Sequence, residues 1–159
     1  MNILNEFVSQ AQRRPHAAAI IQLRQGDNGH FEEEVRCSYL ALLEEARQLA
    51  ANLQAQVGVR AQVGIVMGNT PEWVLADIAL LLADLVEVPV PLAFSGEQAA
   101  FLLQNCQAVL TDATGAQRLT QWQANGCSYR RRCSLSRWAK RRAMQRRWSR
   151  IPPTARRMA

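Results

Sequence analysis

The stretch VGIVMGNTPEWVLADIALLLADLVEVPVPL, residues 63–92, decides how this chain folds. A short apolar run leads into a turn with glycine and proline, a longer run with apolar residues at helical spacing follows, and a second short apolar run ends the stretch. Short apolar runs bounded by turn residues are typical of buried strands, and Pro71 followed by Glu72 favours the first turn of a helix. The stretch therefore predicts a strand, a helix and a second strand, which is the unit of a parallel sheet.

The turn from Gly68 to Glu72 could either bind a phosphate or simply begin the helix. A phosphate loop needs several glycines, so that consecutive N–H groups converge on the anion, and usually a lysine. This turn has one glycine, Pro71 has no N–H to donate, and Glu72 places a negative charge where a phosphate would lie. We therefore predict a helix capped by Thr70, and no phosphate site.

The rest of the first 122 residues alternates between helical and strand patterns. Turn and capping residues separate the patterns, and Ser95 with Gln98 fits a capping box. Three helices are expected: residues 2–14, a helix that Ser38 caps and Gly58 ends, and a helix that Ser95 caps and that extends to Asn105. The expected strands are a buried strand at 17–23, a half-exposed strand at 30–39 and a strand at 108–111. We predict an α/β fold with a mostly parallel sheet and helices on both faces.

Charge divides the 159 residues into two parts. Residues 1–126 hold all 13 acids and seven arginines, a net charge of −6, whereas residues 127–159 hold 11 arginines, Lys140 and no acid, a net charge of +12. The whole chain has the 48% apolar content of a globular protein, and the basic tail needs a separate explanation.

The sequence predicts a cytoplasmic protein without a transmembrane segment. The first residues lack a basic start followed by an apolar core, and acids and prolines interrupt the apolar region 74–92. The four cysteines show no Cys-x-x-Cys spacing, so reduced thiols are expected and a zinc site is not. The sequence does not predict an oligomeric state.

Several segments together resemble a known family. These segments are Ser38-Tyr39 with the helix through Leu53, then residues 63–73, 86–92 and 109–112. Their order and spacing resemble the N-terminal part of the AMP-binding, adenylate-forming superfamily, with the acyl-CoA synthetases (fatty-acid–CoA ligases) as the closest branch. The resemblance covers residues 1–122. One departure is Asp84, where family members usually have glycine or another small residue, and it is expected to weaken packing.

The resemblance implies a chemistry whose motifs do not occur in this chain. Enzymes of the family use ATP and Mg²⁺ to activate a carboxylic acid as an acyl-adenylate, and they pass the acyl group to CoA. Their Gly/Thr-rich loop ending in Pro-Lys, their ribose-binding aspartate and their lid lysine all follow the matched region. Residues 111–117 come nearest to such a loop, but they lack the lysine and are expected to form a strand end and a connector. We therefore predict no catalytic, cofactor-binding or metal-ligating residue here, and no cofactor for this part of the fold.

The sequence also lacks the motifs of other kinds of catalytic or metal site. His16 and His30 have no motif around them, and Ser95-Gly96 is explained by a helix cap. The acids 32–34 lie on a predicted strand, where adjacent side chains point to opposite faces, so a solvated edge is expected and a metal site is not.

The basic tail, residues 123–159, allows three hypotheses. Arginines with Trp138 and Trp148 could bind nucleic acid or an anionic surface. A composition rich in Arg, Ser, Trp and Cys without acids is also what a frameshifted GC-rich gene would encode, and such a tail would be disordered. A split ligase, completed by a second chain, is the third hypothesis. The main expectation is a truncated acyl-CoA synthetase-like protein that is inactive alone, with exposed apolar faces that reduce its solubility.

Overall fold

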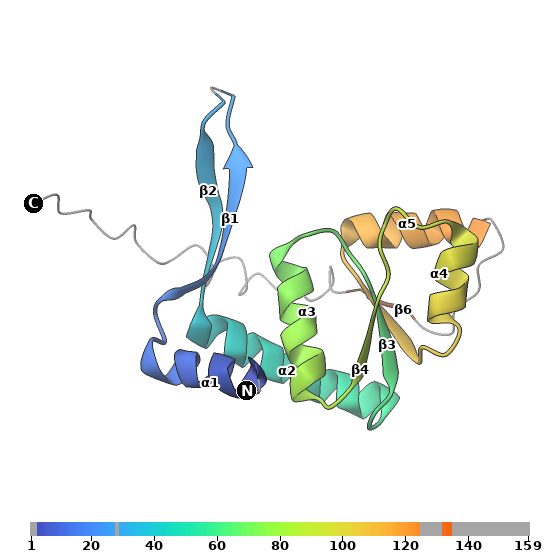
Figure 1. Ribbon diagram of the computed structural model, residues 1–159, viewed down its shortest axis with the longest axis horizontal. Coiled ribbons are helices and arrows are strands. Elements are labelled where there is room, and N and C mark those ends of the chain that lie inside the picture. The colour runs from blue at the N-terminus through green and yellow to red at the C-terminus, as the bar shows by residue number, and fades with distance from the viewer. Residues whose placement is uncertain (1–2, 28, 125–131, 135–159) are drawn as a thin grey trace, which may run out of the picture.

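The computed structural model describes residues 3–27, 29–124 and 132–134. A helix and a hairpin come first, and a series of alternating helices and strands follows (Figure 1). The elements are α1 (Ile3–Arg13), β1 (Ala18–Gln25), β2 (Phe31–Ser38), α2 (Tyr39–Val57), β3 (Gln62–Val66), α3 (Pro71–Leu82), β4 (Val86–Pro89), α4 (Gly96–Leu103), β5 (Ala108–Thr111), α5 (Ala113–Ala124) and β6 (Arg132–Ser134). No helix in these described ranges is long and apolar enough to cross a membrane.

A parallel sheet of order β4-β3-β5-β6 forms the centre of the chain. Val63 of β3 lies between Glu87 of β4 and Ala108 of β5, so all three strands run in the same direction and in register. The α/β fold with a mostly parallel sheet is therefore confirmed. Strand β6 lies within residues 123–159, where no strand was predicted.

Helices cover both faces of this sheet, as predicted. Residues of α2 and α3 pack on one face in a core that includes Val63, Ile65 and Leu110. Residues of α4 and α5 pack on the other face, where Val66 and Val109 lie. Figure 1 shows β3 and β4 between α3 on one side and α4 with α5 on the other. The alternation of side chains along each strand produces the two cores.

The predicted start and end of α2 and the predicted start of α4 are confirmed by their caps, whereas α4 ends at Leu103, before the predicted Asn105. The Ser38 hydroxyl accepts a hydrogen bond from the Ala41 N–H at 3.2 Å, and α2 ends before Gly58, whose φ is 81°. Ser95 and Gln98 form both bonds of the capping box at the start of α4. These local signals fix where the helices begin because each satisfies N–H groups that the helix itself leaves free.

Helix α3 begins where predicted, but without the predicted side-chain cap. Thr70 occupies the N-cap position, yet its hydroxyl makes no hydrogen bond and is buried without a partner. The helix ends in a Schellman motif, in which the Leu85 N–H donates to the Leu80 carbonyl at 3.0 Å and the Asp84 N–H to the Leu81 carbonyl at 3.4 Å. Asp84 therefore holds the left-handed conformation, with a φ of 51°.

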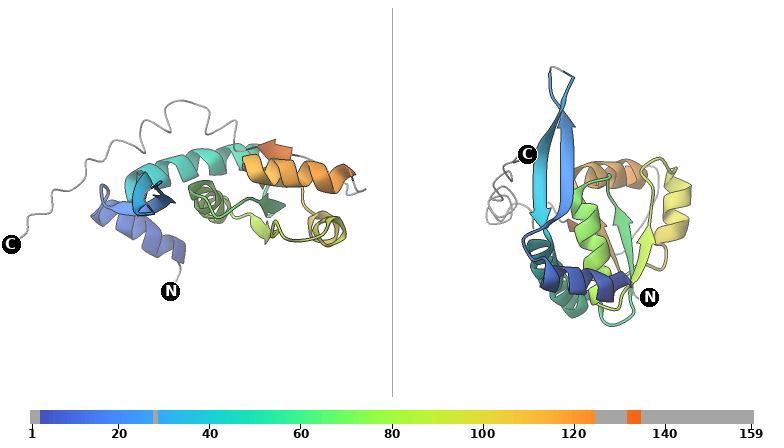
Figure 2. Two further views of the ribbon diagram at one scale, coloured as in Figure 1. Left: turned by 90° about the horizontal axis from the view of Figure 1, so that it is seen from above. Right: turned by 60° about the vertical axis from the view of Figure 1, so that its left-hand side comes forward.

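The hairpin β1–β2 differs from the prediction in two respects. The strand expected to be buried at 17–23 is only half-buried or exposed, because the hairpin projects from the body of the molecule (Figures 1 and 2). The register also shifts at Glu34, so that Leu23 lies opposite Glu33 while Gln22 lies opposite Val35. This β-bulge breaks the strict alternation expected for residues 30–39 and places Glu33 and Arg36 on the same face.

Helix α5 begins where a strand end and connector were expected. The Asp112 carboxylate accepts a hydrogen bond from the Gly115 N–H at 2.6 Å, three residues later, which is the geometry of an N-cap. Gly115 lies so close to the Val66 carbonyl that an added Cβ would stand 1.7 Å from its oxygen. The glycine in this segment therefore allows close packing of α5 on β3.

Candidate functional site

Ligands of open parallel sheets usually bind beyond the carboxyl ends of the strands, which here include the ends of β3 and β5. Gly68 follows β3 and Asp112 follows β5. One oxygen of the Asp112 carboxylate accepts from the Gly68 N–H at 3.0 Å, and the other accepts from the Gly115 N–H at 2.6 Å. Backbone donors that could have met an anion thus already hold an internal carboxylate.

The turn from Gly68 to Glu72 has the geometry of a helix start. The Gly68 N–H is engaged by Asp112, Pro71 is the first residue of α3, and Glu72 lies in its first turn. The negative ends of Asp112 and Glu72 complement the positive N-terminal ends of α5 and α3. These contacts agree with the sequence-based interpretation of the turn as scaffold.

The segment after β4 is held by α5. Arg118 donates from Nε to the Leu92 carbonyl at 2.8 Å and from Nη2 to the Phe94 carbonyl at 3.0 Å, and the indole Nε1 of Trp122 donates to Phe94 at 3.1 Å. The guanidinium carbon lies 5.3 Å from the Trp122 ring centroid. The sequence did not indicate Arg118, because its charge alone gives no sign that it binds two backbone carbonyls.

A pair of carboxyl groups lies between α3 and β4. Burial, followed by the hydrogen bond with Asp77 and the charge of that residue, raises the pKa of Glu87 from 4.5 to about 7. Both side chains are half-buried at the edge strand of the sheet. Inward-pointing charges on an edge strand discourage pairing with another strand, so this pair has a structural explanation.

The other candidate groups also have structural roles. Burial, with the nearby Glu45 charge, raises the pKa of the Cys37 thiol to about 12, so that this thiol is no nucleophile near neutral pH. Glu33 pairs with Arg36, and Glu34 lies 4.0 Å from Arg24, both as exposed ion pairs. No cluster of three metal-ligating side chains occurs in the part of the chain that the structure describes.

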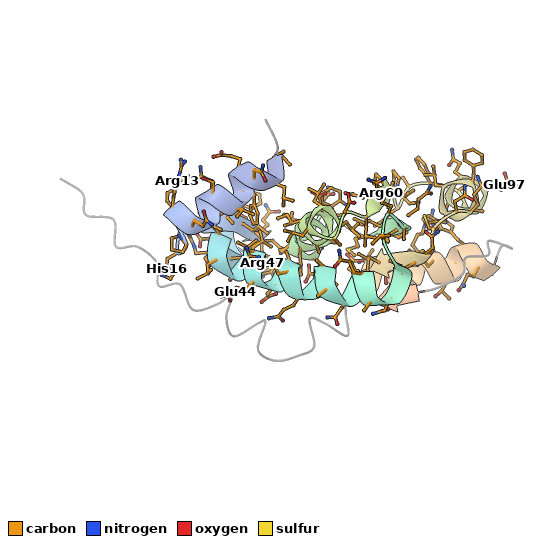
Figure 3. The ribbon with its side chains drawn as sticks, turned by 90° about the horizontal axis from the view of Figure 1, so that it is seen from below. Arg13, His16, Glu44, Arg47, Arg60 and Glu97 are labelled. Carbon is orange, nitrogen blue, oxygen red and sulfur yellow. The ribbon has the colours of Figure 1, made fainter. Side chains whose placement is uncertain are left out.

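The ionisable side chains labelled in Figure 3 are spread over the molecule. Arg13 and His16 lie toward the end of α1, and Glu44 and Arg47 lie on α2. Glu97 lies on α4, at the opposite end of the molecule. These labelled side chains therefore do not converge on one site.

Comparison with known proteins identifies the family. The family model of the AMP-binding enzymes matches residues 7–146, so the match extends beyond residue 122, where the resemblance between motifs ended. Tyrocidine synthase 2 of Brevibacillus parabrevis is 34% identical over 117 residues, covering 72% of this chain, and a linear gramicidin synthase of the same organism is 31% identical over 117 residues, covering 71%. The chain spans only 3% and 1% of these two relatives.

Two solved structures share the fold. A protein assigned as a long-chain-fatty-acid CoA ligase, from Rhodopseudomonas palustris, has a TM-score of 0.65 and 17% identity. Coronafacic acid ligase from Pectobacterium brasiliense has a TM-score of 0.67 and 20% identity. Each alignment covers 84% of this chain, but only 32% and 25% of the respective ligase chains.

The chain forms a parallel sheet flanked by helices, and one family model matches most of its length. Together these observations define its class. The chain belongs to the family of AMP-binding, adenylate-forming enzymes. Within that class it corresponds to a part of the fold, since it spans 32% and 25% of the two solved ligases.

Proposed function

We propose that the described part of this chain is a scaffold subdomain of an adenylate-forming acid ligase, and that it does not form an acyl-adenylate by itself. The bridge from Asp112 to the Gly68 and Gly115 N–H groups supports this proposal most directly. These contacts give the carboxyl edge of the sheet a structural role, which supports a location of the chemistry in other parts of the fold.

In this proposal ATP, Mg²⁺ and CoA bind to parts of the domain beyond the matched motifs. The sequence offers no Gly/Thr-rich loop with Pro-Lys in residues 1–159. Such a loop, with a metal ion, would neutralise the charge that develops on the leaving pyrophosphate. Completion of the domain would therefore be required before a carboxylic acid could be activated.

The class of acid is left open by the relatives. The expectation of a fatty acid came from a resemblance to acyl-CoA synthetases, and one solved relative is assigned to long-chain fatty acids. The curated relatives are instead named as synthases of tyrocidine and linear gramicidin. We therefore propose carboxylic-acid activation as the function of the completed domain, and a cytoplasmic location with buried, reduced Cys37 and Cys106.

Equilibrium dialysis of the 159-residue chain against ATP with Mg²⁺, and separately against CoA, tests the proposal. We expect no saturable binding of either ligand at millimolar concentration. Saturable binding of ATP by this chain would contradict the assignment as scaffold.

The hypotheses about the basic tail fall mostly on residues outside those that the structure describes. Binding to nucleic acid, a frameshifted origin and a split ligase therefore all stay predictions. Translation of the coding DNA in all three frames beyond residue 119 separates them. A neighbouring frame that contains a Gly/Thr-rich loop with Pro-Lys supports the frameshift. Confirmation of the arginine-rich frame with no such loop makes the tail the feature to test.

A further inference from the structure

We draw no further inference here: the strongest candidate, the carboxyl edge of the parallel sheet at the starts of α3 and α5, where the hydroxyls of Thr70 and Thr111 are buried without a partner, belongs to the site already described, and nothing in the described part of the chain shows that either hydroxyl is directed toward a ligand.

Discussion

Asp84 adopts a backbone conformation that favours glycine. Its φ of 51° places it in the left-handed region, and its side chain reaches Arg60, which has a φ of 53°, at 3.6 Å. Both side chains of this ion pair are 83% exposed, so the pair gains little from its Coulomb attraction in water. Asp84 therefore holds a conformation in which glycine would be less strained, and the expected weakening of packing stays a prediction.

Replacement of Asp84 by glycine should stabilise the fold. We expect Asp84→Gly to raise the free energy of unfolding by about 1 kcal/mol, because a non-glycine residue pays roughly that amount to hold the left-handed conformation. The midpoint of urea unfolding measures the change. Asp84→Ala is the matched control, since it removes the same carboxylate but keeps Cβ; an equal gain in both variants would contradict the conformational explanation.

Glu87 should make stability depend on pH. Its pKa is raised from 4.5 to about 7 by burial and by Asp77, so the folded state holds a proton that the unfolded state releases between these values. The urea midpoint should therefore fall as the pH rises from about 4.5 to 7, and then level off. Glu87→Gln should reduce this fall and should be the more stable protein at pH 8.

The control for Glu87 is Glu32→Gln, which neutralises an exposed carboxylate on the hairpin. It should leave the slope of stability against pH unchanged in this range. A wild-type midpoint that rises between pH 4.5 and 7 would show that the carboxyl pair does not bind the extra proton.

Among the helices, substitutions at the N-caps of α4 and α3 are expected to change stability in different ways. Ser95→Ala removes a hydroxyl that accepts from the Gln98 N–H at 3.2 Å, and should cost about 1 kcal/mol of stability. Thr70→Val removes a hydroxyl that is buried without a partner, and should be neutral or stabilising. Urea unfolding of both variants compares them; an equal loss in both would contradict the different roles of the two caps.

Most element boundaries could be predicted because their signals are local. Ser38, Ser95 and Gly58 act within one turn of their own helix, so their effect is visible in the sequence. Asp112 gives the same kind of signal at the start of α5, because aspartate is a preferred capping residue. The neighbouring glycine and threonines resemble a Gly/Thr-rich loop, so a connector was predicted there instead. The shift in register at Glu34 has no comparable local signal, because it depends on the opposite strand.

The contacts at the sheet edge could not be predicted from sequence. Arg118 and Leu92 are 26 residues apart, and Asp112 and Gly68 are 44 apart, so these bonds exist only once the strands are in order. The family, in contrast, could be recognised from the order and spacing of short segments. The prediction that no catalytic motif is present rests on residue types alone, and it stays a prediction.

For the molecule as a whole, the central claim is that this chain contributes scaffold and not chemistry to an adenylate-forming domain. The family match and the fold define the parent class. The internal carboxylate at the edge of the sheet gives that edge a structural role. We therefore propose that activity requires the completed domain.

The measurement that tests this claim most directly is acid-dependent ATP–pyrophosphate exchange by the purified 159-residue chain. The assay contains Mg²⁺ and, in turn, fatty acids, aromatic acids and amino acids. We predict that no acid raises exchange above the level measured without acid. Saturable exchange that depends on one acid, and that copurifies with the chain, would contradict the account.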